Sequence, residues 1–330
     1  MEKFVPKIKR VEVNPSVKGD LRKGKELFLE KRFDDALAEF EAIIKNDPAS
    51  LPAHLAAGRI KYKQKKYDEA LTHFQAGIRL DPLKTQAYLR AARIFAFKGE
   101  LTQALEYLQN AIKLKPKSII AYAGSGRIYL RQEKYEEAIK HFTIALRLNP
   151  RLVSARQSLA SAYIEIGNYT EAVSQLLAAL RIEPENAEVY AALGRVYLLE
   201  KKYKAAREAY QHVMKILPSA PPVVKLGYAE SLIEENLLDE AKAMLSEIPD
   251  KNQLGARLHK LWGDIYHRQG LFKEATEEYK AATLIASEEK EKESFDLFPE
   301  LEEDEDWEDV SASYKKSLDD LIAKRRYSLE

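Results

Sequence analysis

The chain has 330 residues, with 53 Lys and Arg against 52 Asp and Glu, 45% hydrophobic residues, 13 Gly, 13 Pro and no Cys. Without cysteine it cannot form a disulfide framework, a thiolate metal site or a cysteine nucleophile. It contains no run of about 18 apolar residues, the length that a membrane helix needs, and its Lys-rich start lacks the apolar core of a signal peptide. We therefore expect a cytoplasmic protein without membrane insertion, and the low glycine content favours long helices.

The first segment in chain order, residues 1–16, is basic, and it alternates apolar with charged residues between Phe4 and Val13. Such alternation is typical of extended backbone. We predict an extended basic N-terminal segment and assign no partner to it.

A 34-residue period follows this segment. Prolines recur at that interval at Pro48, Pro82, Pro116, Pro150, Pro184 and Pro218. Alanines keep the interval from Ala36 to Ala206 and, after a slip of one residue, continue at Ala241 and Ala275. This periodicity predicts a repeat array over residues 17–289. Its eight predicted repeats are 17–50, 51–84, 85–118, 119–152, 153–186, 187–220, 222–255 and 256–289.

Each repeat has the pattern of two amphipathic helices. In the fourth repeat, apolar residues follow three-and-four spacing from Ile119 to Arg131 and again from Tyr135 to Leu148. The proline after the second helix has no N–H to donate and forces its predecessor out of helical geometry, so it ends that helix. Small residues such as Gly126 and Ala138 allow two helices to approach to about 8 Å. The pattern predicts an all-α protein.

The repeats resemble the tetratricopeptide repeat (TPR) family. The family's pattern of large, Leu-Gly, Tyr, Ala, Phe, Ala and Pro positions is similar to the sixth repeat, with Tyr190, Leu193, Gly194, Tyr197, Ala206, Tyr210, Val213 and Pro218. The eighth repeat similarly has Gly263, Tyr266, Gly270, Phe272, Ala275, Tyr279 and Ala282. Asp20 and Arg156 depart from the large-residue position, and the second helix of the seventh repeat is cut short at Ile248-Pro249, where we expect irregular stacking.

The resemblance implies a right-handed superhelical solenoid of about eight helix-turn-helix repeats. In this family the first helix of each repeat lines a concave groove that holds peptides or partner proteins, and its second, fifth, ninth, twelfth and thirteenth positions tend to face that groove. The ninth position here is mostly cationic. The candidate ligand-binding residues are Lys25, Arg59, Tyr62, Leu89, Arg93, Phe97, Arg127, Arg131 and Arg195.

Unpaired arginines spaced about 10 Å apart would attract an anionic partner, and a guanidinium suits a carboxylate. An alternative is that groove carboxylates or solvent already satisfy these arginines. A second cationic column, Lys45 to Lys215 at 34-residue spacing, is accounted for by the helix dipole, because it lies near the second helices' C-terminal ends.

Charge divides the chain. Residues 1–220 hold 38 cations and 25 anions, a net charge of +13, and residues 221–330 hold 15 and 27, a net charge of −12. Residues 290–310 form an acidic tail segment, which we expect either to be a solvated interaction tail or to occupy the groove of its own or a neighbouring chain. Residues 311–330 again have a helical pattern, and we predict a helix that caps the last repeat or docks onto another protein.

The sequence gives little support for catalysis. It has no HExxH pair, P-loop or Gly-x-Ser-x-Gly motif. His73 and His141 occupy the same repeat position, as duplicated surface residues would. We therefore expect no enzyme activity, no catalytic residue, no metal site and no cofactor.

Three functions remain. The favoured one is a scaffold or adaptor that binds an acidic, partly apolar peptide or partner segment in its groove, with possible regulation by its own tail. The first alternative is a structural scaffold that self-associates through its tail or terminal repeats. The second, which we consider unlikely, is binding of nucleic acid or another polyanion to the cationic part of the chain.

Overall fold

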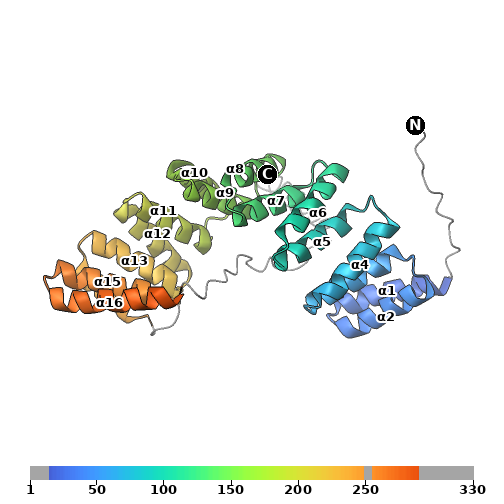
Figure 1. Ribbon diagram of the computed structural model, residues 1–330, viewed down its shortest axis with the longest axis horizontal. Helices are drawn as coiled ribbons and strands as arrows, with labels where there is room; N and C mark the ends of the chain where they lie inside the picture. The colour runs from blue at the N-terminus through green and yellow to red at the C-terminus, as the bar shows by residue number, and fades with distance from the viewer. Residues whose placement is uncertain (1–14, 249–254, 290–330) are drawn as a thin grey trace, which may run out of the picture. The chain divides into compact units, whose positions relative to one another are not determined.

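The computed structural model describes residues 15–248 and 255–289, and these residues form sixteen helices joined by short loops (Figure 1). The predicted N-terminal segment, apart from Pro15 and Ser16, the acidic tail and the C-terminal helix lie outside the described residues. The helices are α1 (Pro15–Leu29), α2 (Phe33–Asn46), α3 (Leu51–Lys63), α4 (Tyr67–Leu80), α5 (Thr85–Phe97), α6 (Leu101–Leu114), α7 (Ile119–Arg131), α8 (Tyr135–Leu148), α9 (Val153–Glu165), α10 (Tyr169–Leu180), α11 (Ala187–Leu199), α12 (Tyr203–Ile216), α13 (Pro222–Glu234), α14 (Leu238–Ser246), α15 (Gly255–Arg268) and α16 (Phe272–Glu289).

The helices pack as consecutive pairs. Among α1 to α14, each odd-numbered helix contacts the even-numbered helix that follows it, and from α2 to α14 each even-numbered helix also contacts the next odd-numbered one. From α5 to α15, successive odd-numbered helices also contact one another. Successive even-numbered helices in the described residues make no comparable contacts. The odd-numbered, first helices therefore form the more closely spaced layer. We call the face of this layer turned away from the second helices the first-helix surface.

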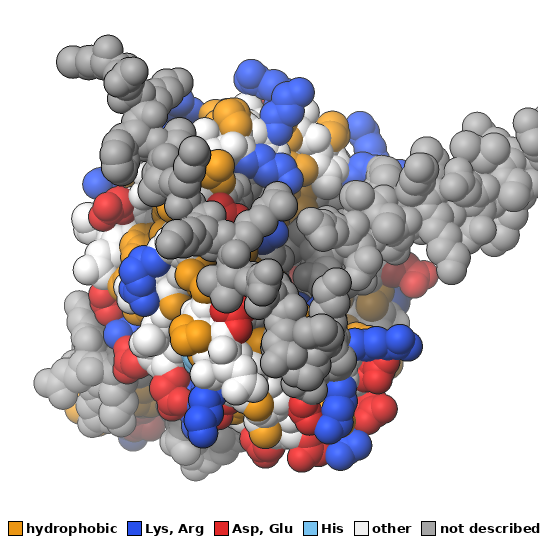
Figure 2. All heavy atoms as spheres, turned by 90° about the vertical axis from the view of Figure 1, so that its right-hand side faces the viewer, with side chains coloured by type: hydrophobic (Ala, Val, Ile, Leu, Met, Phe, Trp, Pro, Cys, Tyr) orange, Lys and Arg blue, Asp and Glu red, His pale blue; other side chains and the backbone are white. Residues whose placement is uncertain are grey.

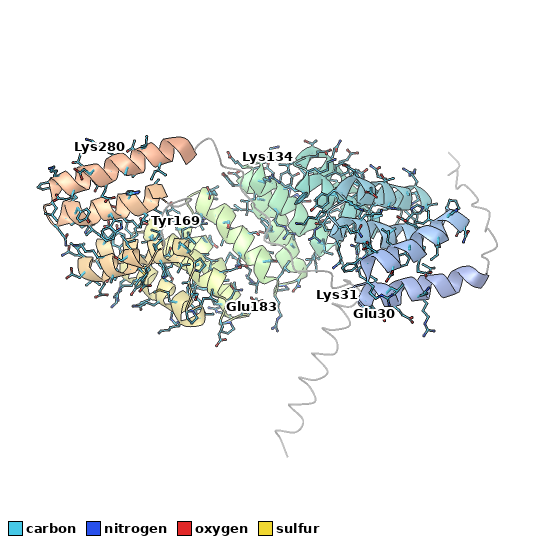
Figure 3. All side chains as sticks on the ribbon, turned by 90° about the horizontal axis from the view of Figure 1, so that it is seen from below. Glu30, Lys31, Lys134, Tyr169, Glu183 and Lys280 are labelled. Carbon is cyan, nitrogen blue, oxygen red and sulfur yellow. The ribbon has the colours of Figure 1, made fainter. Side chains whose placement is uncertain are left out.

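The turn inside each pair has one conformation throughout the array. Its central residue adopts a positive φ in all eight pairs, at Lys31, Lys65, Gly99, Glu133, Gly167, Lys201, Asn236 and Gly270. In the fourth pair Glu133 N donates to Leu130 O at 3.0 Å and Lys134 N donates to Tyr129 O at 2.9 Å, which is a Schellman motif. Figure 3 labels Lys31 and Lys134 in two of these turns. Glycine adopts this backbone conformation without strain, and the Lys and Glu residues do not.

The loop between pairs depends on the recurring proline. Asp47 Oδ1 accepts from Ala49 N at 3.1 Å across Pro48, and Asn149 Oδ1 accepts from Arg151 N at 3.0 Å across Pro150. These side chains replace the helical hydrogen bonds that the proline prevents, so the second helix ends and the next first helix can begin. Ser118 and Asn186 then cap α7 and α11 through the backbone N–H of the third following residue.

Small residues bring the two helices of a pair together at one recurring point. A Cβ atom on Gly58 would lie 2.7 Å from the ring of Phe74, sixteen residues later in the chain. The other repeats with glycine at this position also carry an aromatic residue sixteen positions on; the pairs are Gly24 with Phe40, Gly126 with Phe142, Gly194 with Tyr210 and Gly263 with Tyr279. The remaining three repeats combine alanine with leucine, as Ala92 with Leu108, Ala160 with Leu176 and Ala229 with Leu245. At these two positions, therefore, the smaller glycine is combined with the larger aromatic side chain, and the larger alanine with the smaller leucine.

The core follows the same periodicity. The alanine early in each second helix is fully buried from Ala36 to Ala241, and Phe40, Phe74 and Phe142 are buried beside it. Burial of one such ring contributes about 1.5–3 kcal/mol. The predicted short second helix of the seventh repeat is confirmed, because α14 has 9 residues where α12 has 14.

Candidate functional site

The predicted cations lie at equivalent places on successive first helices. Lys25 is on α1, Arg59 on α3, Arg93 on α5, Arg127 on α7 and Arg195 on α11. Because these helices are stacked with a constant repeat, equivalent positions form a row along the layer of first helices. Their surroundings differ from repeat to repeat.

Two of the arginines stack on aromatic rings from the preceding repeat. The guanidinium carbon of Arg59 lies 4.8 Å from the ring centroid of Phe28, and that of Arg93 lies 5.0 Å from the ring centroid of Tyr62. In both cases the ring is 31 residues earlier in the chain. Such cation–π contacts contribute about 0.5–1 kcal/mol at exposed sites and limit the orientations of the guanidinium.

Arg127 has no such ring, because the residue 31 positions before it is Ala96. Its side chain is half-buried, and within the described residues it forms no hydrogen bond or ion pair. Burial, and then the positive charge of Arg93, lower the pKa of Arg127 below its ordinary value. Arg127 is thus a partly desolvated cation beside a second cation, an arrangement that a bound anion would stabilise.

Arg131 is used differently, since its Nη1 donates to the backbone oxygen of Ala96 at 3.1 Å. It therefore joins α7 to α5. Its role in the structure is therefore to connect two repeats.

An aromatic cluster adjoins Arg93. The ring centroids of Tyr62 and Tyr67 are 5.5 Å apart, and those of Tyr67 and Phe97 are 4.4 Å apart. Phe97 is 51% exposed despite its size. Leu89, on the same helix as Phe97, is half-buried. The site thus combines cations with accessible apolar surface, both from repeats two to four.

The row of cations ends toward the C-terminal repeats. Its fifth place is Ser161, whose hydroxyl donates to Gln157 O, and its seventh and eighth places are acidic. Glu230 accepts from Arg257 at 2.6 Å, and Asp264 accepts from Tyr279 at 2.8 Å. These carboxylates are satisfied within the array.

Lys25 and Arg195 are exposed cations at the two ends of the row. Figure 2, which looks onto the N-terminal end of Figure 1, shows Lys and Arg side chains interspersed with Asp and Glu. The visible surface is therefore of mixed charge, and the distinguishing feature of the candidate site is the lack of a carboxylate partner for Arg127 among the described residues.

The burial of three side chains was not predicted. Lys61 is buried in α3 and forms ion pairs with Glu41 at 3.3 Å and with Glu69 at 2.7 Å. His73 was expected at the surface, and this is wrong, because it is half-buried and 3.1 Å from His54. His141 is also half-buried, against Tyr122 and Tyr129. The 19-residue spacing between His54 and His73 joins the facing sides of two paired helices, and could have indicated the contact.

In the part of the chain that the structure describes, no group of three or more His, Asp or Glu residues is arranged to hold a metal ion. None of the helices in residues 15–248 and 255–289 combines the length and apolar character needed to cross a membrane.

Comparison with family models decides the family. Two models described as tetratricopeptide repeat match the chain, one at residues 21–84, 55–119 and 89–152, and the other at residues 129–196, 167–226 and 197–265. The chain belongs to the tetratricopeptide repeat family. It is an all-α TPR solenoid, and this family implies a protein–protein interaction scaffold rather than a catalytic fold. A comparison with curated proteins found no match.

Solved structures agree on the fold. The TPR array is similar to PilW, described as a widely conserved type IV pilus biogenesis factor, with a TM-score of 0.58 and 18% identity over 64% of this chain and 98% of that one. PilF of Pseudomonas aeruginosa has a TM-score of 0.55 and 16% identity over 65% and 96% of the two chains. A tetratricopeptide repeat protein from Parabacteroides merdae has a TM-score of 0.50 and 16% identity over 82% and 94%. At these identities the likeness concerns the fold alone.

Proposed function

We propose that this TPR array is a scaffold that binds an acidic, partly apolar segment of a partner protein on the first-helix surface of repeats two to four. The observation that carries the proposal is Arg127, a half-buried cation beside Arg93 with no carboxylate partner in the described part of the chain. Desolvating a charge without pairing it costs free energy, and a partner carboxylate recovers that cost. Acidic groups of the partner would contact Arg93 and Arg127.

The aromatic contacts support the same function. Tyr62 already orients Arg93, so less side-chain conformational entropy is lost when the guanidinium of Arg93 binds a carboxylate. Phe97, Tyr62 and Leu89 would contact the apolar side chains of the segment, with Phe97 the most accessible. Lys25, Arg59, Arg131 and Arg195 would extend the charged surface along the array.

The acidic tail is a candidate regulator. Residues 288–309 contain 13 Asp and Glu against 2 Lys and include Phe295, Leu297 and Phe298, so their composition matches the proposed ligand. A tethered ligand acts at high effective concentration and would compete with a partner. Deleting residues 294–330 should then tighten binding of an acidic peptide. Unchanged or weaker binding after the deletion would rule out this form of regulation.

The main test compares the full chain with a double charge reversal, Arg93→Glu and Arg127→Glu. Proteins captured from cell extract would be identified by mass spectrometry, and affinities for the captured partner measured by titration calorimetry. We expect the reversal to cost well over the ~1 kcal/mol of an exposed ion pair. A matched control is Arg147→Glu, an exposed cation of the second-helix column. If the double reversal binds like the unaltered protein, the partner contacts a different surface.

The same measurements separate the alternatives. Self-association would appear as a concentration-dependent mass in sedimentation experiments. Binding of nucleic acid would weaken steeply as salt is raised, because phosphate contacts release counterions, whereas a segment anchored partly by apolar contacts would weaken less.

A further inference from the structure

Two histidines and a proline carbonyl connect three consecutive segments of the first two repeats. His54 on α3 and His73 on α4 place their Nδ1 atoms 3.1 Å apart, and Nε2 of His54 lies 3.1 Å from the backbone oxygen of Pro48. Pro48 belongs to the loop between α2 and α3. We call these three groups the histidine clasp. It links the loop that enters the second repeat to both helices of that repeat.

The carbonyl determines where the protons lie. An oxygen of this type only accepts, so Nε2 of His54 carries a hydrogen, and in the neutral ring its Nδ1 is an acceptor. Nδ1 of His73 must then donate to it. A proton added to His73 enters at Nε2 and leaves this hydrogen bond in place. A further proton on His54 puts two N–H groups against each other at 3.1 Å, and the contact becomes repulsive.

The fifth repeat contains the same contact in a form that does not titrate near neutral pH. Arg156 and Gln175 stand 102 residues, or three repeats, after His54 and His73. Nε and Nη2 of Arg156 donate to Pro150 O at 3.2 and 2.7 Å, and its Nη1 donates to Gln175 Oε1 at 3.0 Å. Pro150 is likewise 102 residues after Pro48. Arginine remains protonated at all relevant pH values, so this version of the clasp is insensitive to pH.

The charged groups around the histidine clasp disfavour additional protons. Burial is the main cause that lowers the pKa of His73, followed by His54 and by Lys61 of α3, while Glu41 of α2 and Glu69 of α4 act in the opposite direction. Both carboxylates are already paired with Lys61, at 3.3 and 2.7 Å. They are therefore poorly placed to compensate two imidazolium charges.

We propose that the histidine clasp is a pH-sensitive contact. It holds the N-terminal repeats together near neutral pH and opens when weak acid protonates both rings. This goes beyond the proposed ligand-binding function and does not depend on it. The sign follows from proton linkage. Burial lowers the pKa of His73 below its ordinary value of about 6.5, so the folded chain binds fewer protons at His73 than the unfolded chain does, and the stability of these repeats falls as the pH drops below that value.

The test is hydrogen exchange of the full chain, read by mass spectrometry at about pH 7.5 and about pH 5.5, on either side of the ordinary histidine pKa, and corrected for intrinsic exchange. Protection of α1 to α4 should fall several-fold at the lower pH, because the opened clasp no longer holds the two repeats together. Helices α9 and α10, held by Arg156 and Gln175, should show no comparable loss.

The decisive variant replaces the histidine clasp with the contact found in the fifth repeat, by combining His54→Arg with His73→Gln. We call it the transplanted variant. It should keep the protection of α1 to α4 at low pH. His141→Gln, which removes a half-buried histidine that faces tyrosines, should leave the acid response intact. An equal loss of protection in the transplanted variant, or none in the unaltered protein, would overturn the proposal.

A second measurement covers the case in which the transplanted variant does not fold. Imidazole ¹⁵N spectra of the unaltered chain should show His54 protonated at Nε2 and His73 at Nδ1 near neutral pH. If both rings instead titrate as independent, exposed histidines, the clasp does not exist.

Discussion

A Cβ atom built on Gly126 of α7 would lie 2.8 Å from Cε1 of Phe142 of α8, closer than two such carbons can pack. The ring of Phe142 is fully buried and fills the space that a side chain at position 126 would need. Since every repeat has either glycine with an aromatic residue or alanine with leucine at these two positions, the pair of residues, and neither one alone, sets the approach of the two helices.

We expect Gly126→Ala to destabilise the array by about 1–3 kcal/mol, because the added methyl group displaces a close-packed ring. Combining it with Phe142→Leu reproduces the alanine and leucine of the third repeat and should recover part of that loss. Urea unfolding of the two single variants and the double variant measures the coupling between the positions. Additive effects would mean that the ring moves away freely.

The turn residues give predictions of opposite sign. Gly99 has a φ of 80°, and a Cβ there would have no other atom within 4 Å, so Gly99→Ala tests backbone strain alone. We expect the free energy of unfolding to fall by about 1 kcal/mol.

Replacing Glu133, which has a φ of 59°, by glycine should instead stabilise the protein. The gain should be up to about 1 kcal/mol after the entropy of the unfolded chain is counted. Both changes are measurable as shifts of the urea midpoint, and a loss in Glu133→Gly would contradict the strain argument.

Alkaline pH should weaken the sixth repeat through Tyr210. Burial raises the pKa of Tyr210 to about 12. Above pH ~10 the unfolded chain loses this phenolic proton while the folded chain keeps it, so stability falls as the pH rises, by up to about 2 kcal/mol by pH ~12. Tyr210→Phe removes the titrating group but keeps the ring against Gly194. Urea midpoints between these pH values should fall less steeply in this variant, and identical slopes would count against the buried phenol.

Two single variants separate the charged from the apolar part of the proposed site. Phe97→Ala should weaken the partner by about 1 kcal/mol or more and leave the salt dependence of binding unchanged, because an apolar contact is lost. Arg127→Gln should weaken binding and also reduce its salt dependence, because an ion pair is lost. Calorimetric titrations at three salt concentrations distinguish these outcomes. Circular dichroism checks that both variants remain folded.

The 34-residue period allowed the helices and turns of the array to be predicted well, because the residues that determine them are local and repeated. Pro48 and its equivalents end second helices, and Gly126 and its equivalents lie where two helices cross. The irregular seventh repeat could also be found, since its proline comes early, at position 249.

The environment of the site could not be predicted in the same way. The ninth-position pattern identified Arg59, Arg93 and Arg127 as equivalent residues, yet their surroundings depend on a residue in the preceding repeat. Phe28 and Tyr62 stack on the first two arginines, and Ala96 leaves the third without a ring. Propensity and amphipathic pattern describe single helices and do not include this contact between repeats. The His54–His73 contact was missed because His73 was treated as a surface residue and was compared only with His141, its equivalent in the fourth repeat.

The matched pairs of small and large residues also bear on how such an array can be rearranged. Gly126 and Phe142 belong to the same repeat, so a duplication or deletion with breakpoints in the proline loops carries both partners together. A recombination breakpoint between the two positions instead joins glycine to leucine, leaving a void, or alanine to phenylalanine, causing a steric clash. Repeat number can therefore change in whole units at little cost in packing, whereas chimeras cut inside a helical pair lose stability.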